Sequence, residues 1–268
     1  MVGTLPGPSG ARNLGEKIQY AQLLLAWTRR EFRIRYTQTL LGSVWSIVQP
    51  LGLTLAFTFL FRGLTKIDVG VPYVLYAYLG ASLWTMLSGG ITMATSVLTN
   101  SLPIAGKVSY PRSVAPLAGS LLAVVDLLIA VAIFPVLVLS LGHSMSFRPI
   151  MLLASVGGCL VLSIGLGLMV SALTVFVRDL KNALPFIFQI GVLISPIGYP
   201  ASQLPDGIRT ISEWNPITTY VVAFRSSLLD LAGPTAMDWL RSLVITAVVC
   251  IAGMGYFARV ESRFTDVA

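Results

Sequence analysis

The chain carries few charged residues for its length. Only 11% of its 268 residues are Asp, Glu, Lys or Arg, whereas a soluble domain has about 25%. Hydrophobic residues make up 55% of the chain. So few charges cannot cover a water-exposed surface, and lipid is therefore the expected solvent. The net charge of +7 does not indicate nucleic acid, because no basic, aromatic-bearing soluble segment is present to carry it.

Cysteine and histidine are also scarce. Cys159 and Cys250 both fall in apolar runs, where small packing residues are expected, and His143 falls in a short predicted loop. These numbers and positions exclude a disulfide framework and a Cys/His metal cluster.

Motifs for nucleotide binding and for catalysis are missing. The nearest fragment to a phosphate-binding loop is Gly106-Lys107-Val108, which lacks both the upstream glycine and the hydroxyl that hold ATP phosphates. No HExxH or G-x-S-x-G motif occurs, and the carboxylates between residues 200 and 241 are scattered. The sequence therefore predicts no catalytic residue, no metal site and no cofactor in this chain.

Long apolar windows are the main feature that is present. A transmembrane helix needs about 20 mostly apolar residues. The candidate windows are Val44 to Phe61, Val71 to Met93, Ser113 to Leu141, Pro149 to Val177, Ala183 to Tyr199 and Ser242 to Ala258. We expect an all-α membrane protein with six transmembrane helices in a single domain over residues 1–268. Its expected parts are a tail with an interfacial helix (1–36), spans one to five (44–199), an outer region (200–241) and span six (242–258).

The positions of Lys and Arg predict the orientation, because these residues collect in cytoplasmic loops. With the N-terminus inside, twelve fall on the cytoplasmic side and six, including Arg225, fall on the outer side. Both termini are therefore expected in the cytoplasm.

A basic segment precedes the first span. Its cluster consists of Arg29, Arg30, Arg33 and Arg35 and ends at Tyr36. Apolar residues recur at helical spacing from Leu14 to Tyr36, which predicts an amphipathic helix in the membrane interface with its arginines toward anionic headgroups. The alternative is a solvated segment that only sets the topology.

Three connections between spans are distinctive. Residues 100–112 and 178–182 form short polar features at the expected inner face. The outer region contains three prolines and an apolar stretch, Ile217 to Phe224, that is too short to span. Such a stretch can enter the outer leaflet only where protein or water covers its backbone.

Asp126 is the one charged residue inside a predicted span. A charge at that depth is costly and suggests a function. A polar contact with Ser or Thr on a neighbouring helix is the alternative.

Small residues recur every four positions in the fourth span. They are Ser155, Cys159, Ser163, Gly167 and Ser171. They would share one helix face that allows close helix approach, either within the chain or at a dimer seam.

Aromatic residues gather near the outer ends of the first two spans. They are Phe57, Phe61, Tyr73, Tyr76 and Trp84. An interfacial aromatic belt is one interpretation, although Trp84 lies too deep for a belt. Aromatic faces also stack on the C–H faces of sugars, so the same residues are candidates for a saccharide path.

Five motifs occur in order along nearly the whole chain. They are Arg35-Tyr36-x-x-Thr39-x-Leu41-Gly42-x-x-Trp45-x-x-x-x-Pro50, Lys107-Val108-x-Tyr110-Pro111-Arg112, Phe176-x-Arg178-Asp179, Ser195-Pro196-Ile197-x-Tyr199 and Asn215-Pro216. The series resembles the permease subunits of type-2 ABC exporters for polysaccharides, which include O-antigen (lipopolysaccharide), capsule and teichoic-acid exporters. Any one motif is weak, but the ordered series is specific.

The resemblance implies a homodimer in a bacterial cytoplasmic membrane, paired with two copies of a separate ATPase that holds ATP and Mg. The implied ATPase contacts are Pro103, Lys107, Tyr110, Pro111, Arg112, Arg178, Asp179 and Lys181. The implied outer gate includes Pro196, Tyr199, Asn215 and Pro216, with short outer helices between spans five and six. The aromatic residues named above would line the sugar path.

The expected function is export of a lipid-linked polysaccharide from the cytoplasmic side by a transporter subunit that is not itself an enzyme. One alternative is a type-2 ABC exporter of small hydrophobic compounds, which would favour an aliphatic path. Another is an integral membrane transferase acting on polyprenyl-linked sugars, which would need a carboxylate or metal cluster. A secondary transporter is disfavoured by the single buried charge.

Overall fold

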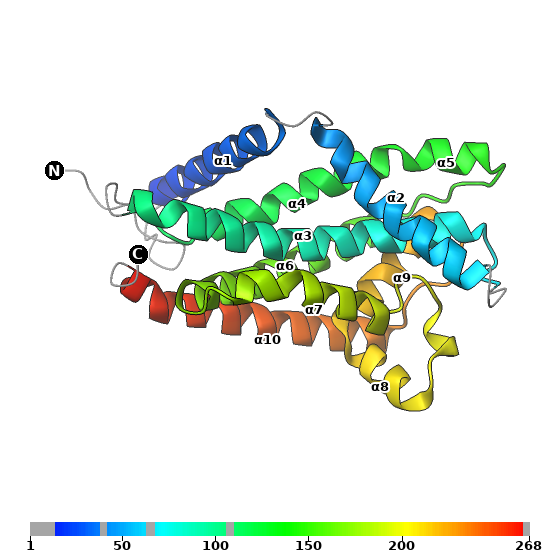
Figure 1. Cartoon of the computed structure of the whole chain (residues 1–268). Helices are drawn as coiled ribbons and strands as arrows, with labels where there is room; N and C mark the ends of the chain where they lie inside the picture. Colours follow the sequence, from blue (N-terminus) through cyan, green and yellow to red (C-terminus); the bar gives the residue numbers. More distant parts are fainter. Residues whose placement is uncertain (1–13, 38–41, 63–67, 106–109, 265–268) are drawn as a thin grey trace.

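The computed structural model describes residues 14–37, 42–62, 68–105 and 110–264, and every regular element in these ranges is a helix (Figure 1). The α-helices are α1 (Leu14–Thr37), α2 (Trp45–Phe57), α3 (Tyr73–Ala105), α4 (Val114–Ala132), α5 (Phe134–Ser140), α6 (Pro149–Phe176), α7 (Leu180–Ile194), α8 (Asp206–Trp214), α9 (Pro216–Leu228) and α10 (Ala236–Val260). Short 3₁₀ turns occur at Gly42–Val44, Ala201–Gln203 and Glu261–Arg263, and a π-helical turn, Thr58–Arg62, extends α2.

Five helical stretches are long and apolar enough to cross a membrane. They are Gly42–Phe61, Tyr73–Leu102, Val114–Ser140, Pro149–Phe176 and Ala236–Arg263. The predicted all-helical membrane fold is thereby confirmed, and these five correspond to five of the six expected windows.

The remaining window forms α7, an apolar helix of 15 residues. We expected this span to run to Tyr199, but the helix ends at Ile194. Ser195 is extended, with φ −83° and ψ 138°, because the ring of Pro196 disfavours helical backbone in the residue before it. The five residues that follow α7 therefore form a separate non-helical piece.

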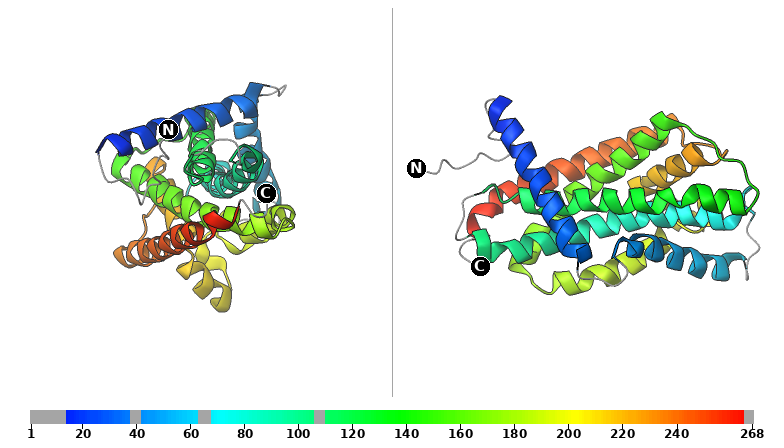
Figure 2. Two further views of the ribbon diagram at one scale, coloured as in Figure 1. Left: turned by 90° about the vertical axis from the view of Figure 1, so that its left-hand side faces the viewer. Right: turned by 90° about the horizontal axis from the view of Figure 1, so that it is seen from above.

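α3 is the most enclosed of the five long helices and forms the centre of the bundle, between α4 and α6 (Figures 1 and 2). The small residues of α6 face this centre and are all buried. Added to Gly167, a Cβ atom would lie 3.0 Å from the Ala94 side chain of α3. The stripe therefore serves packing within the chain, and the dimer-seam interpretation of it was wrong.

α1 crosses the bundle instead of running along it (Figure 2). It docks through polar and aromatic side chains: the Tyr20 hydroxyl lies 3.0 Å from Ser113 Oγ, and the rings of Trp27 and Tyr110 are 4.8 Å apart. By contrast, Ile18 and Leu25, on the predicted apolar face, are exposed. Placement of this exposed face in lipid stays a prediction.

α9 contains the apolar stretch that is too short to span. It packs between α3, α6 and α10 at the end of the bundle opposite the start of α1 (Figure 1). Tyr220 on α9 is fully buried, and its hydroxyl lies 2.7 Å from Thr246 Oγ1 on α10. Protein thus covers this stretch, as a short helix at membrane depth requires.

Candidate functional site

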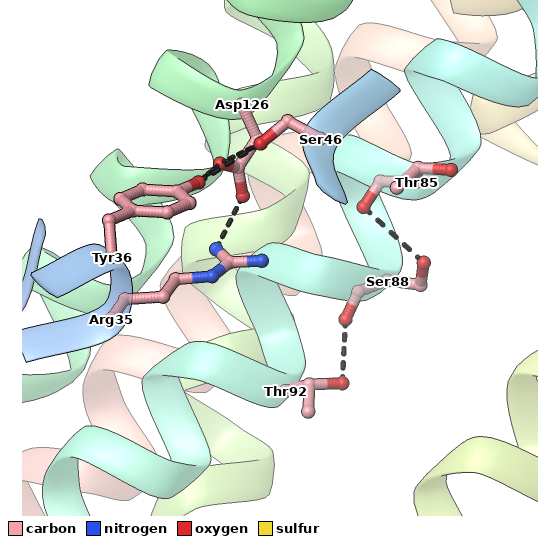
Figure 3. Close-up of polar contacts among 7 residues, drawn as sticks. All are labelled: Arg35, Tyr36, Ser46, Thr85, Ser88, Thr92 and Asp126. Carbon is pink, nitrogen blue, oxygen red and sulfur yellow. Dashed lines mark hydrogen bonds and ion pairs between the residues drawn. The ribbon is translucent and has the colours of Figure 1, made fainter. Parts of the chain in front are cut away.

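Asp126 lies in the middle of α4 and accepts three side-chain hydrogen bonds (Figure 3). The donors are Arg35, which also forms an ion pair with it, Tyr36, and Ser46 Oγ at 2.8 Å. The contact with a serine on a neighbouring helix matches one of the two interpretations of Asp126. Arg35, expected to face lipid headgroups, instead points into the bundle, because a buried carboxylate needs a compensating charge.

Tyr36 is a neutral donor in this network. The pKa of its phenol is raised above the ordinary 10.0, mainly because the group is buried and secondly because it donates a hydrogen bond to Asp126. The other arginines of the basic cluster, Arg29, Arg30 and Arg33, are exposed. Arg30 lies 3.6 Å from a carboxylate oxygen of Glu31. The structure therefore separates Arg35, which ties α1 to α4, from three arginines on the surface.

The end of α3, the start of α4 and the turn between α6 and α7, which carry the described candidate ATPase contacts, lie at the end of the bundle where α1 begins (Figure 1). Arg178 and Asp179 are exposed on the turn between α6 and α7, and Lys181 is exposed in the first turn of α7. Pro103 falls within α3, and Lys107 lies outside the described residues.

The other three candidate contacts are less accessible. Tyr110 stacks on α1, Pro111 is buried, and Arg112 donates a hydrogen bond to the Glu261 carbonyl. Arg112 therefore ties the segment before α4 to the 3₁₀ turn that follows α10. A role of any of these residues in ATPase contact stays a prediction.

Non-helical residues 195–199, here called the outer segment, follow α7 and are all buried. The Tyr73 hydroxyl donates to the Gly198 carbonyl at 2.5 Å, and the Tyr199 hydroxyl donates to the Leu193 carbonyl. Irregular backbone at membrane depth needs such partners, because hydrocarbon offers none.

The expected gate residues come together around this segment. Pro196 and Tyr199 belong to it, and Pro216 is the first residue of α9. Asn215 caps α9 and donates Nδ2 to Ser195 Oγ at 3.0 Å. A gate made of these residues is geometrically coherent, although gating itself stays a prediction.

Three of the candidate path aromatics, Phe57, Phe61 and Tyr73, contact the same segment, whereas Trp84 packs against Phe188 of α7. Four of them, Phe57, Tyr73, Tyr76 and Trp84, are buried, and Phe61 is half-buried. The Phe57 ring lies against Gly198, and the rings of Phe61 and Tyr199 are 5.4 Å apart. In this conformation four of the five residues are buried in the core, so they can line a path only if the outer segment moves.

Arg225 is the residue at this end that we misplaced. We counted it among the outer loop charges, but it lies inside α9 and is 2% exposed. Burial lowers the pKa of its guanidinium, yet an arginine stays protonated in proteins. The available signal was an arginine directly after an eight-residue apolar run.

A row of hydroxyls on α3 was also missed. We use "hydroxyl row" for Thr85, Ser88, Thr92, Ser96 and Thr99, which are all half-buried. Their spacing of three and four residues places them on one helix face, and Figure 3 shows the first three projecting from the same side. Four of them donate to carbonyls of α3 itself, as Thr92 does to Ser88 at 2.8 Å. Their oxygen lone pairs remain available as acceptors.

Among the described residues no group of three or more His, Cys, Asp or Glu side chains could hold a metal ion. The described residues instead provide a row of hydroxyls, a cluster of aromatic side chains, and a non-helical segment held between helices by hydrogen bonds. These features are suited to binding a ligand rather than to catalysis.

A profile of the ABC-2 type transporter family matches residues 22–229. Three relatives are each named O-antigen export system permease protein RfbA. Two come from Klebsiella pneumoniae, with 21% and 24% identity, each over 91% of this chain and 94% of the relative. The third, from Myxococcus xanthus, is 20% identical over 95% of this chain and 98% of the relative. Because the matched region covers the helices from within α1 to the start of the segment after α9, the chain belongs to the ABC-2 type transporter family.

Proposed function

We propose that this chain is the permease subunit of an exporter that moves a lipid-linked polysaccharide of the O-antigen class from the cytoplasmic side. The observation that carries the proposal is the similarity to three O-antigen export permeases over 91% to 95% of the chain. A separate nucleotide-binding subunit hydrolyses the ATP, because this chain has no phosphate-binding loop of its own.

The assembly we propose is a homodimer with two ATPase copies in the bacterial cytoplasmic membrane. α7 serves as a sixth span, so both ends of the chain face the cytoplasm. The beginning of α1 and the end of α10 lie at the same end of the bundle (Figure 1), which supports this topology. The exposed turn from Arg178 to Lys181 is at that end and is the most accessible ATPase contact.

The hydroxyl row supplies the polar track for the glycan. Four of its hydroxyls already donate to carbonyls of α3, but their oxygens can still accept hydrogen bonds, so a half-buried row along the central helix fits a surface that meets water or sugar. The row ends near Trp84, next to the aromatic cluster. When the outer segment opens, these rings offer stacking faces for sugars. An exporter of small hydrophobic compounds would favour an aliphatic track instead.

The proposal is tested with the chain and its ATPase partner in vesicles supplied with a lipid-linked O-antigen glycan. Export should require both proteins and ATP. The double variant Ser88→Ala with Thr92→Val removes two acceptors from the row. We expect export to fall about tenfold, the worth of one to two net hydrogen bonds. Thr95→Val is the matched control, because Thr95 is a hydroxyl residue of the same helix that is fully buried, whereas the residues of the row are half-buried.

Glycan movement by the chain alone would contradict the ATPase assignment. Equal export by the double variant and the Thr95→Val control would remove the hydroxyl row from the path while leaving the family unchanged.

A further inference from the structure

The geometry points to Arg225 as a positioning residue that latches the outer segment against α3 in the closed state. The inference rests on the proposed function only in assuming that the outer segment opens during transport. It deepens the outer gate by naming the group that holds it shut.

The first observation is that a single guanidinium binds two successive carbonyls of the outer segment. Arg225 Nη1 donates to the Pro196 carbonyl at 3.3 Å, and Nη2 donates to the Ile197 carbonyl. The next carbonyl, of Gly198, takes the Tyr73 hydroxyl. Three consecutive carbonyls of a buried, non-helical segment are thus satisfied by side chains from other helices.

The second observation is that the same guanidinium is anchored on α3. Its Nε donates to the Tyr76 carbonyl at 2.9 Å, and its central carbon lies 3.5 Å from the centroid of the Tyr76 ring. Arg225 therefore connects α9, α3 and the outer segment at one point. A planar fork of donors can do this, whereas the single ammonium of lysine cannot reach all three carbonyls.

The third observation is a notch in α3 at Gly80. A Cβ atom at this position would clash with Arg225 Nη2 and would lie 2.5 Å from the Ile197 carbonyl oxygen. Only glycine leaves room for the guanidinium and the segment together. The site is therefore shaped on both sides, by the arginine from α9 and by the missing side chain on α3.

The fourth observation is that the positive charge of Arg225 is stabilised by backbone carbonyl dipoles and one aromatic ring rather than by a carboxylate. Within the described residues no ion pair involves Arg225. A buried charge without a counter-ion stays costly even when it is fully hydrogen-bonded. Water admitted by an opening segment would solvate the guanidinium and the freed carbonyls. The hydrogen bonds of the closed arrangement are thus specific in geometry, but water can replace them. This suits a contact that opens and closes better than a permanent structural contact.

The test measures whether the outer segment becomes accessible when the latch is removed. Ile197 is fully buried, so Ile197→Cys introduces a protected thiol. Native Cys159, also fully buried, is kept to report loosening of the bundle, and half-buried Cys250 is replaced by Ala. This background is reconstituted with its ATPase partner in vesicles without nucleotide and treated with a membrane-impermeant maleimide.

Two independent variants break the latch. Arg225→Gln removes the fork, and Gly80→Ala displaces it while leaving the charge in place. Gly89→Ala is the matched control, since a Cβ at that glycine of the same helix meets nothing within 4 Å. If one latch variant fails to accumulate, the other still gives the result.

We expect both latch variants to label at position 197 at least tenfold faster than the background and the Gly89→Ala control, with Cys159 still protected. Unchanged labelling at position 197 would overturn the latch. Equal labelling of Cys159 would overturn it too, because Arg225 would then only stabilise the bundle. The readout needs no glycan, so a failed latch is distinguishable from a wrong cargo.

Discussion

The two buried charged residues Asp126 and Arg225 each organise a set of polar contacts. Asp126 and Arg225 lie at different levels of the bundle and are satisfied in different ways. Asp126 has a cationic partner in Arg35, whereas Arg225 is held by backbone carbonyls and a tyrosine ring. A paired charge is costly to break, so Asp126 fits a structural tie between α1 and α4. Arg225, which has no ionic partner among the described residues, fits a contact whose hydrogen bonds water can replace.

At this scale we predict a coupling between Asp126 and Arg35. Asp126→Asn and Arg35→Gln should each destabilise the purified protein by about 2 kcal/mol, because each leaves a partly buried group without its partner. The double variant should be less destabilised than the sum, with a coupling energy of about 1–3 kcal/mol. Unfolding midpoints in detergent measure this.

Arg30→Gln is the control for that cycle. Arg30 is exposed and pairs with half-buried Glu31 of the same helix, and an ion pair of an exposed arginine contributes at most about 1 kcal/mol. Strictly additive losses for Asp126 and Arg35 would show that the ion pair does not stabilise the fold.

Helix elements come close where glycines face each other. At the crossing of α6 and α10, a Cβ on Gly253 would collide with the Gly165 carbonyl oxygen, and a Cβ on Gly165 would lie 2.7 Å from Cys250 Cα. Backbone-to-backbone contact of this kind is how membrane helices pack without a hydrophobic driving force. This contact joins α10, the least enclosed long helix, to the bundle.

Gly253→Ala should therefore destabilise the protein by about 1–3 kcal/mol, the usual cost of overpacking. Gly255→Ala, two residues along α10, should be neutral or slightly stabilising, since nothing lies within 4 Å of its Cβ position and alanine favours helix. Thermal unfolding of both variants is the measurement. A Gly253→Ala protein as stable as Gly255→Ala would mean that the two helices separate at little cost.

In the whole molecule, α7 joins the two regions for which we propose functions. This helix starts at the exposed turn that we propose for ATPase contact and ends at the buried outer segment. Of its side chains only Leu184 and Val192 are buried. A lightly packed helix of this kind can transmit a displacement from one end to the other without rebuilding the core.

For the whole assembly we predict that Arg178→Glu with Lys181→Glu abolishes export and ATPase stimulation while leaving the unfolding midpoint within about 0.5 kcal/mol of the parent. Both side chains are exposed, so the bundle loses nothing. Arg112→Glu is a poorer probe, because it removes a hydrogen bond to the Glu261 carbonyl and disturbs the inner end. Normal export by the double variant would place the ATPase contact elsewhere.

Hydropathy alone was enough to predict an all-helical membrane fold, because a membrane-spanning helix is recognised from a run of consecutive apolar residues. Five windows became long helices, and the sixth was cut short at Pro196 by a local steric rule. The ordered motifs also grouped Pro196, Tyr199, Asn215 and Pro216, and the structure brings these residues together around one segment, although a gating role stays a prediction.

The partners of polar side chains were not predictable in this way. Arg225 meets Tyr76 across 149 positions of sequence, and Arg35 meets Asp126 across 91. No local pattern records such distances, so Arg225, in a short apolar stretch, was counted as a loop charge, and the pairing of Arg35 with Asp126 was not predicted. The order of residues alone established which segments are apolar enough to enter lipid, because this depends on consecutive residues. The folded bundle was needed to establish which groups the buried charged side chains contact, because each of these side chains needs a polar partner and that partner lies far along the chain.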